Sequence, residues 1–225
     1  MTPPTDRKPA QVWALLSLLL ANLWPVAGVY LWGWSLTELL MLYWLESAVI
    51  GVFTVLRMIT AHQEGQPLLA QVGVKMVTVP FFLFHYGLFW LVHGVFLVIL
   101  FARDAIPAVN GLNTLLFLPI NYSLSEAALF AWPLALMLLS HGVDFVSGYL
   151  VTGENRRSAP QRLMMQPYAR VFVLHITIIV GAFLVLAAGQ SRMVLLLFVM
   201  LKIVADVLAH MRGARRGSVS QVAAV

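Results

Sequence analysis

Long apolar runs separated by short polar segments dominate the pattern of hydrophobic and polar positions along this chain. Six of these runs reach the length of about 20 mostly apolar residues that a membrane-spanning helix needs. They cover residues 12–32, 36–57, 76–102, 127–150, 169–189 and 192–211. The pattern therefore predicts an all-α, polytopic membrane protein with six transmembrane helices.

The segments outside these runs predict one transmembrane domain with a tail at each end. Residues 1–11 form an N-terminal tail, residues 12–212 a single six-helix domain, and residues 213–225 a flexible C-terminal tail. Within the domain, residues 103–126 contain three helix-disfavouring Gly or Pro residues and only a short apolar stretch. We expect this segment to be an extracytoplasmic interfacial or re-entrant loop rather than a seventh span.

The distribution of Lys and Arg predicts how the six helices are oriented. With six spans, the N-terminus, the second and fourth loops and the C-terminus share one side of the membrane. That side carries 11 Lys and Arg residues, whereas the opposite side carries only 2, and Lys202 lies inside the sixth run. Basic residues accumulate on the cytoplasmic side of membrane proteins. Both termini are therefore predicted to be cytoplasmic.

The composition agrees with a protein embedded in lipid. Hydrophobic residues make up 61% of the 225 residues and charged residues 10%, against about 45–50% and about 25% in a typical soluble domain. This excludes an ordinary soluble enzyme, a disordered chain and a nucleic-acid-binding module. The net charge of +5 comes from residues at the ends of apolar runs, which indicates membrane topology and contact with anionic lipid. The lipid bilayer is thus the first predicted partner.

Ten ionisable side chains nevertheless lie within the predicted spans, on five of the six helices. They are Glu38, Glu46, His85, His93, His141, Asp144, His175, Lys202, Asp206 and His210. A charged side chain at the centre of a bilayer costs at least about 2.5–3.5 kcal/mol. Such groups are therefore expected to pair with one another or with a cation. Because the chain has no cysteine, any metal site must use His, Asp, Glu and water.

The spacing and depth of these residues predict one cluster, mainly between the midplane and the cytoplasmic surface. His141 and Asp144 lie on one helix face at i,i+3, and Lys202, Asp206 and His210 form a stripe at i,i+4 spacing. His with carboxylate and no thiolate suits zinc first, and iron or manganese next. The predicted metal ligands are Glu46, His85, His141, Asp144, His175 and Asp206, followed by His210.

Two of these assignments keep alternatives. The stripe of Lys202, Asp206 and His210 is equally well explained as a salt bridge with a histidine that caps the helix end. His93 lies eight residues, about 12 Å, further out than His85. It is expected to belong to an upper layer of the site or to hydrogen-bond across helices.

The cluster is compatible with a metal-dependent intramembrane hydrolase. The ion would lower the pKa of a bound water, and Glu46 or Asp144 would act as general base. Lys202 is a candidate for polarising the substrate oxygen. A site reached from the cytoplasmic leaflet would suit a lipid or a small apolar substrate delivered by the membrane.

Three other functions are open on the sequence alone. Chains of buried His and carboxylate groups also mark proton-coupled transporters and proton relays. Paired histidines can ligate haem, and His85 and His175 are candidates for facing one another as axial ligands. A polar network can also serve only to fix helix packing. The sequence is compatible with a homo-oligomer and does not identify the substrate.

Several short strings, spread over about residues 14–212, resemble an uncharacterised family of prokaryotic multi-pass membrane proteins, identified only as a domain of unknown function. They are YWLES (43–47), FHYGLFWLVHG (84–94), SHGVDF (140–145), PYAR followed by LH (167–175) and KIVADVLAH (202–210). The resemblance implies a location in the cell (inner) membrane and brings no activity. The motif residues that match are Glu46, His85, His93, His141, His175, Lys202, Asp206 and His210. Asp144 stands where the family pattern is expected to be more variable.

Overall fold

A computed structural model describes residues 28, 31, 33–102 and 111–188. Every regular element within these ranges is helical, which confirms the all-α prediction for the described part of the chain. Residues 37–182 form one compact unit, and the candidate site lies within it. The predicted first and sixth spans lie outside the described residues, apart from residues 28 and 31.

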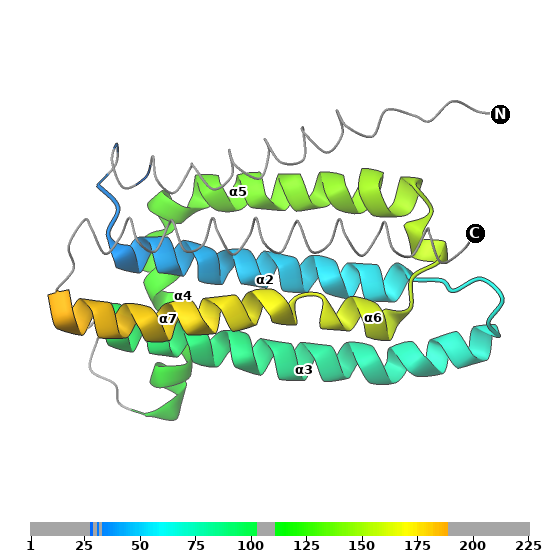
Figure 1. Cartoon of the computed structure of the whole chain (residues 1–225), viewed down its shortest axis with the longest axis horizontal. Coiled ribbons are helices and arrows are strands. Elements are labelled where there is room, and N and C mark those ends of the chain that lie inside the picture. Colours follow the sequence, from blue (N-terminus) through cyan, green and yellow to red (C-terminus); the bar gives the residue numbers. More distant parts are fainter. Residues whose placement is uncertain (1–27, 29–30, 32, 103–110, 189–225) are drawn as a thin grey trace. The chain divides into compact units, whose positions relative to one another are not determined.

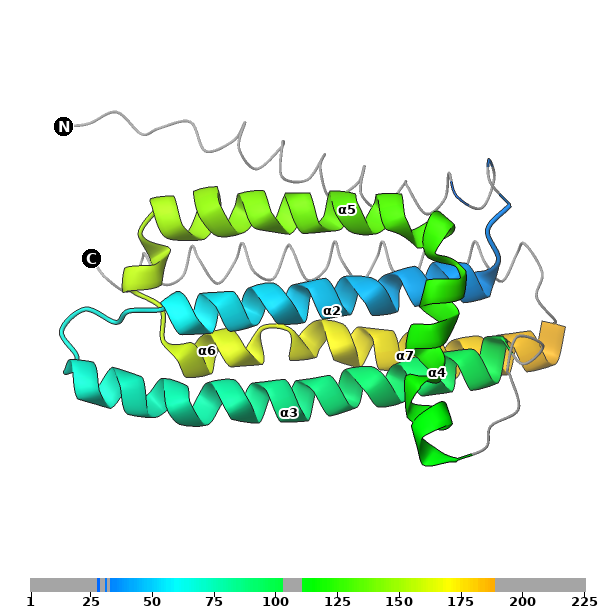
Figure 2. The same cartoon turned by 180° about the vertical axis from the view of Figure 1, so that it is seen from behind.

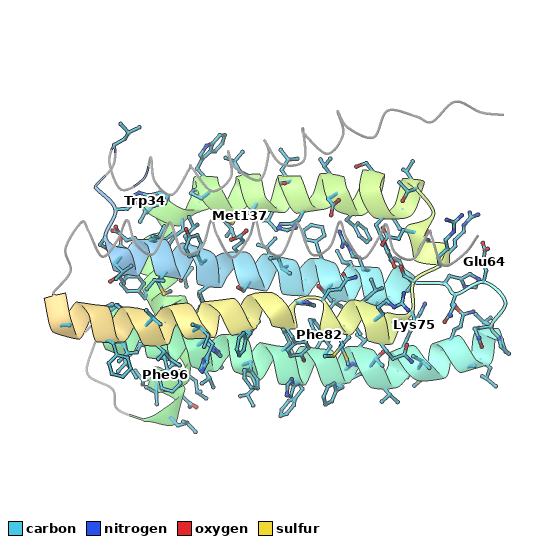
Figure 3. The ribbon with its side chains drawn as sticks, viewed as in Figure 1. Trp34, Glu64, Lys75, Phe82, Phe96 and Met137 are labelled. Carbon is cyan, nitrogen blue, oxygen red and sulfur yellow. The ribbon has the colours of Figure 1, made fainter. Side chains whose placement is uncertain are left out.

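Two long helices, α2 (Leu36–Thr60) and α3 (Leu68–Phe101), run antiparallel in this unit (Figure 1). At one end of the pair, the hydroxyl of Thr37 donates a hydrogen bond of 2.7 Å to the carbonyl of Phe101. At the other end, Lys75 Nζ donates one of 2.8 Å to the carbonyl of Ile59. Glu64 and Lys75 both lie at this second end, where a short loop joins the helices (Figure 3).

The close approach of α2 and α3 depends on glycines that face aromatic rings. A Cβ atom added to Gly94 would lie 2.6 Å from the Trp44 indole, and one added to Gly51 would lie 2.7 Å from the Tyr86 ring. Trp44 stacks on Trp90 with ring centroids 4.1 Å apart, and each indole N–H donates to the backbone carbonyl of the other tryptophan. Small residues let membrane helices approach closely, and here they make room for rings.

The fourth predicted span is helical throughout, but it changes its winding. It consists of α5 (Ala127–Val143), followed directly by the π-helix η2 (Asp144–Val151). Before it, α4 (Leu112–Ser125) crosses the bundle at a steep angle (Figure 2). Part of the segment that we expected as a loop is thus a helix. Its 14 residues span about 21 Å, which is shorter than the roughly 30 Å of a bilayer core.

The predicted fifth span, 169–189, corresponds to α7 (Tyr168–Ala188). It follows the short helices η3 (Glu154–Arg156) and α6 (Pro160–Met165). The backbone N–H groups of His62 and Glu64 bond to the carbonyls of Asn155 and Arg156. The loop after α2 and the turn after η2 therefore lie at the same end of the bundle. This agrees with the predicted alternation of the spans.

A buried aromatic and aliphatic cluster holds this end together. It contains Met58, Ala61, Phe82, Tyr86, Tyr149, Leu163 and Val171, which come from α2, α3, η2, α6 and α7 and from the residue after α2. Phe82, for example, is 1% exposed, and within a membrane such packing stabilises the fold through van der Waals contacts rather than through removal from water. The contacts of α6 and α7 with α3 are thus fixed at the base of the bundle.

Three helical segments of the described chain are long and apolar enough to cross a membrane. They are Leu36–Thr60, Leu68–Phe101 and Ala127–Val151. The outward surface of these segments is apolar, and Phe96 on α3, for example, is 49% exposed (Figure 3). A surface of this kind is expected to face hydrocarbon rather than water. The chain is thus a helical membrane protein, and six spans with cytoplasmic termini remain a prediction.

Candidate functional site

Two histidines from different helices form a direct hydrogen bond, His93 being buried in the bundle and His175 exposed at its surface. His93 of α3 is 4% exposed, and its Nε2 lies 2.7 Å from Nδ1 of His175 on α7. The other ring nitrogen of His93, Nδ1, lies 2.6 Å from the carbonyl oxygen of Phe89, one turn earlier on the same helix. Both nitrogens of His93 are therefore engaged.

This arrangement assigns the protons of the two rings. A carbonyl oxygen can only accept, so Nδ1 of His93 carries the proton and donates a hydrogen bond to the carbonyl oxygen of Phe89. In the neutral ring Nε2 of His93 is then an acceptor, and Nδ1 of His175 must be the donor. Nε2 of His175 is left with a lone pair. The three groups form a directional chain from His175 through His93 to the Phe89 carbonyl.

A second polar contact joins the same two helices closer to the loop end. Nδ1 of His85 lies 2.9 Å from the hydroxyl of Tyr168, and the His85 ring stacks on Phe81 with centroids 5.2 Å apart. The Tyr168 ring meets Tyr86 edge-on at 6.1 Å. His85 precedes His93 by eight residues, so the two tiers are separated by about 12 Å along α3.

The two tiers decide which partner each histidine of α3 has. His85 and His175 were candidates for facing one another as haem ligands, but His85 faces Tyr168 and His175 faces His93. The contact between His85 and Tyr168 shows that α7 begins level with His85, about ten residues above Lys75 on α3. His93 hydrogen-bonds across helices, which was one of the two roles predicted for it.

Asp144 lies at a separate place, next to an arginine. Its carboxylate forms an ion pair with the guanidinium of Arg57, which also lies over the Tyr149 ring at 5.4 Å from the ring centroid. The Tyr149 hydroxyl in turn donates to the carbonyl of Arg57 at 3.0 Å. The Asp144 side chain is 62% exposed. The charge of Asp144 is thus balanced by a cation of the protein, at the point where α5 passes into η2.

The remaining predicted residues are spread over the bundle. His141 on α5 is half-buried and stacks on Phe53 of α2 at 5.8 Å. Glu46 is half-buried on α2. In the part of the chain that the structure describes, no three His, Asp or Glu side chains converge in a way that could hold a metal ion. Lys202, Asp206 and His210 lie outside the described residues, so the complete predicted cluster stays a prediction.

Arg57 and Tyr168 were not among the predicted site residues. Arg57 was used only to count charges for topology, because a basic residue near a helix end normally faces the membrane surface. Tyr168 lies seven residues before His175, which is two helical turns, and His85 lies eight before His93. These matching intervals on two parallel helices were the available signal that Tyr168 and His85 could pair.

Nearly the whole chain also matches the model of a protein family. The model of a family of unknown function (DUF6498) matches residues 4–223. The chain belongs to this family. No curated protein matches the chain, and no solved structure does. For this DUF6498 protein, function is therefore inferred from its own residues and their contacts.

Proposed function

We propose that this membrane protein is a proton-coupled transporter whose proton-binding site inside the bilayer is the His93–His175 pair. The observation that carries the proposal is the 2.7 Å contact between Nε2 of His93 and Nδ1 of His175. On the other side of the His93 ring, Nδ1 donates a hydrogen bond to the Phe89 carbonyl, which fixes the tautomer of this ring. Imidazole is the side chain that ordinarily gains and loses a proton within the physiological pH range.

The hydrogen bonds support an entry point for the proton at Nε2 of His175. A proton added to the lone pair on Nε2 of His175 makes that ring cationic. The proton on its Nδ1 can then pass along the hydrogen bond to Nε2 of His93, which shares the charge between the rings. It cannot pass beyond His93, because the Phe89 carbonyl does not take up a proton at neutral pH. The pair therefore stores a proton and releases it the way it came.

Only one proton is expected on the pair. Two imidazolium rings with nitrogens 2.7 Å apart would repel strongly in a medium of low dielectric constant, so their protonation is coupled. Single occupancy is what a transporter requires if one proton is to drive one conformational cycle. His85 and Tyr168 supply a second hydrogen-bonded pair on the same helix interface.

Proton uptake by the purified protein tests the proposal. The native protein and the double variant His93→Gln/His175→Gln are brought from about pH 8 to about pH 5, and the protons bound per chain are counted with an indicator dye. We expect the double variant to bind one proton fewer than the native protein. His62 lies in an exposed loop, so the variant His62→Gln shows how much proton uptake is lost when one histidine is removed.

Two outcomes would contradict the proposal. A loss of two protons would mean that the histidines titrate independently, and no loss would mean that neither binds a proton in this range. A transport assay with native vesicles can follow once a substrate class is known. The proton count does not depend on the substrate.

A metal site is the second candidate, and one observation favours it. A histidine that binds a metal usually donates its other ring N–H to a fixed acceptor, and Nδ1 of His175 does so to His93. Its Nε2 would then bind zinc, iron or manganese, with Asp206 and His210 as candidate further ligands. Metal analysis and a visible spectrum test this. A stoichiometric metal that is lost in His175→Ala and kept in His62→Ala would support it, and a Soret band would indicate haem.

A further inference from the structure

Arg57 of α2 contacts two residues of η2 at the same time. Its guanidinium forms the ion pair with Asp144, the first residue of η2. Its backbone carbonyl accepts a hydrogen bond of 3.0 Å from the hydroxyl of Tyr149. The guanidinium also lies over the Tyr149 ring, 5.4 Å from the ring centroid. One residue of α2 thus holds η2 at two positions that are five residues apart.

An interval of five residues fits the π winding of η2 and does not fit an α-helix. A π-helix bonds residue i to residue i+5, so residues five apart lie above one another on the same face. In an α-helix, residues five apart point about 140° away from each other around the axis. Asp144 and Tyr149 can therefore both face Arg57 in the π-helix, whereas α winding would turn one of them away.

The backbone of η2 leaves room for the Asp144 carboxylate at Gly148. A Cβ atom added to Gly148 would lie 2.7 Å from Oδ1 of Asp144. The carboxylate thus occupies the space in which a side chain at position 148 would lie. Because the carboxylate is the movable partner in this contact, a methyl group at position 148 would push Asp144 away from its place beside Arg57.

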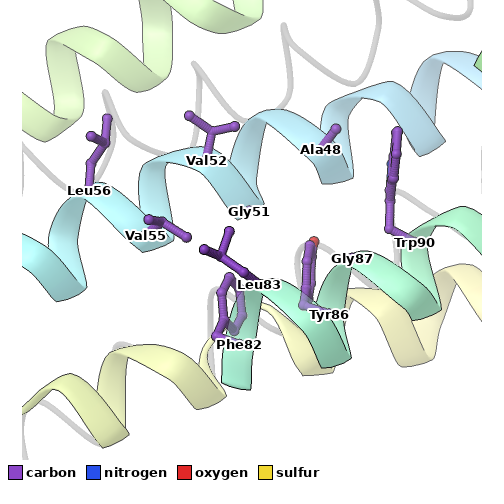
Figure 4. Close-up of a pocket in the computed structure, with 10 residues that line it drawn as sticks. All are labelled: Ala48, Gly51, Val52, Val55, Leu56, Phe82, Leu83, Tyr86, Gly87 and Trp90. Carbon is purple, nitrogen blue, oxygen red and sulfur yellow. The ribbon is translucent and has the colours of Figure 1, made fainter. Parts of the chain in front are cut away.

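Tyr149 is held firmly, and Asp144 is the contact of Arg57 that can come away. Tyr149 is 1% exposed and belongs to the buried cluster that includes Phe82 and Tyr86. Tyr86 projects from α3 towards Gly51 of α2, where the two helices meet closely (Figure 4). The Asp144 side chain, in contrast, is 62% exposed. Loss of the ion pair therefore frees the Asp144 end of η2 while the Tyr149 ring stays packed.

We propose that residues 144–151 are a hinge whose π winding is latched by Arg57. An unpaired charge is costly inside a membrane, so the balance of charge between Arg57 and Asp144 favours the winding that brings them together. A π-helix is otherwise rare, and the segment rewinds as an α-helix when Asp144 leaves Arg57. The rewinding turns α5 relative to the turn that follows η2. The hinge does not depend on proton binding by His93 and His175.

Spin labels placed five residues apart measure the winding directly. Because the chain has no cysteine, introduced pairs of cysteines can carry nitroxide labels without other reaction sites. The pair Val146→Cys/Val151→Cys lies within η2, and the pair Ala131→Cys/Leu136→Cys, with the same spacing, lies within α5. All four side chains are exposed. Dipolar broadening of the electron paramagnetic resonance spectrum then reports the separation of the labels in the η2 pair and in the α5 pair of the detergent-purified protein.

With no further substitution, we expect the labels of the η2 pair to be closer together than those of the α5 pair. In Asp144→Ala, which removes the ion pair, the η2 separation should increase to that of the α5 pair. Gly148→Ala should have the same effect, because its methyl group displaces the carboxylate without removing a charge. Gly142→Ala is the matched control, since a Cβ atom there has only an ordinary contact of 3.7 Å with Phe53.

Three outcomes would overturn the proposal. Equal separations of the two pairs before any further substitution would mean that the segment is not wound as a π-helix. An unchanged η2 separation in both Asp144→Ala and Gly148→Ala would mean that Arg57 does not hold the winding. An equal increase in Gly142→Ala would mean that helix propensity, rather than the contacts of Arg57, sets the winding. The α5 pair, measured in each variant, shows that the helix remains folded.

Discussion

At the scale of single residues, His93 shows how a polar side chain is accommodated inside this bundle. An unsatisfied buried donor or acceptor costs about 1–3 kcal/mol, and His93 is 4% exposed. The Phe89 carbonyl and His175 satisfy both of its nitrogens. Because the acceptor on one side is a carbonyl, the ring has a fixed tautomer. The nitrogen that is left with a lone pair is then Nε2 of His175.

A second contact at the scale of residues joins Gly94 to the ring of Trp44. It depends on glycine, because a Cβ atom at this position would overlap the ring. The ring cannot easily move away, since it stacks on Trp90 and donates its N–H to the carbonyl of Trp90 at 2.6 Å. Gly73 on the same helix has open space where its side chain would be. The two positions therefore separate the effect of packing from the effect of helix propensity.

We predict that Gly94→Ala destabilises the protein and that Gly73→Ala does not. The added methyl group of Gly94→Ala overlaps the indole, which costs about 1–3 kcal/mol against a helix-propensity gain of up to about 1 kcal/mol. Gly73→Ala has only the helix-propensity gain, because its methyl group meets no neighbour within 4 Å. Thermal unfolding of both variants in the same detergent measures the difference. Equal melting temperatures would show that the Trp44 contact does not limit the packing of α2 on α3.

At the scale of elements, the register of α3 against α7 determines which polar groups meet. Lys75 lies seven residues inside α3, which begins at Leu68, whereas Arg170 lies only two residues inside α7, which begins at Tyr168. The short helix α6 packs on α3 below the start of α7. The level of His175 in the bundle therefore depends on where α7 begins relative to α3.

Where α5 changes to η2, His141 and Asp144 both face α2. We expected them on one helix face because they are i,i+3 neighbours, and their partners Phe53 and Arg57 are i,i+4 neighbours on α2. At Asp144 the winding widens into a π-helix, a form that often occurs at functional sites. Asp144 pairs with Arg57 across to α2, and His141 stacks on Phe53. An ion pair between exposed groups usually contributes at most about 1 kcal/mol, so its main effect is to balance charge.

At the scale of the whole molecule, the backbone bonds between residues 62–64 and 155–156 tie two loops to one side. Because the chain has no cysteine, single cysteines report this topology cleanly. We predict that His62→Cys and Gln161→Cys react with a membrane-impermeant maleimide only after cells are opened, and that Ser125→Cys reacts in intact cells. Labelling measured by gel shift provides the readout.

The pattern of labelling separates two claims. If His62→Cys and Gln161→Cys label on opposite sides of the membrane, the packing of the two loops is contradicted. If both label in intact cells while Ser125→Cys does not, the packing holds and the cytoplasmic orientation predicted from Lys and Arg is wrong. A cell-permeant maleimide controls for the accessibility of each cysteine.

The sequence by itself determined the helical membrane class, because long apolar runs have no other stable state than helices in lipid. It also identified histidines worth examining, since polar groups inside apolar runs are costly unless they have partners. Only the tertiary structure decided the partners. Whether His85 meets His175 or Tyr168 depends on where α7 begins relative to α3. That register depends on tertiary contacts such as the packing of α6 on α3, which have no periodic signature in the chain.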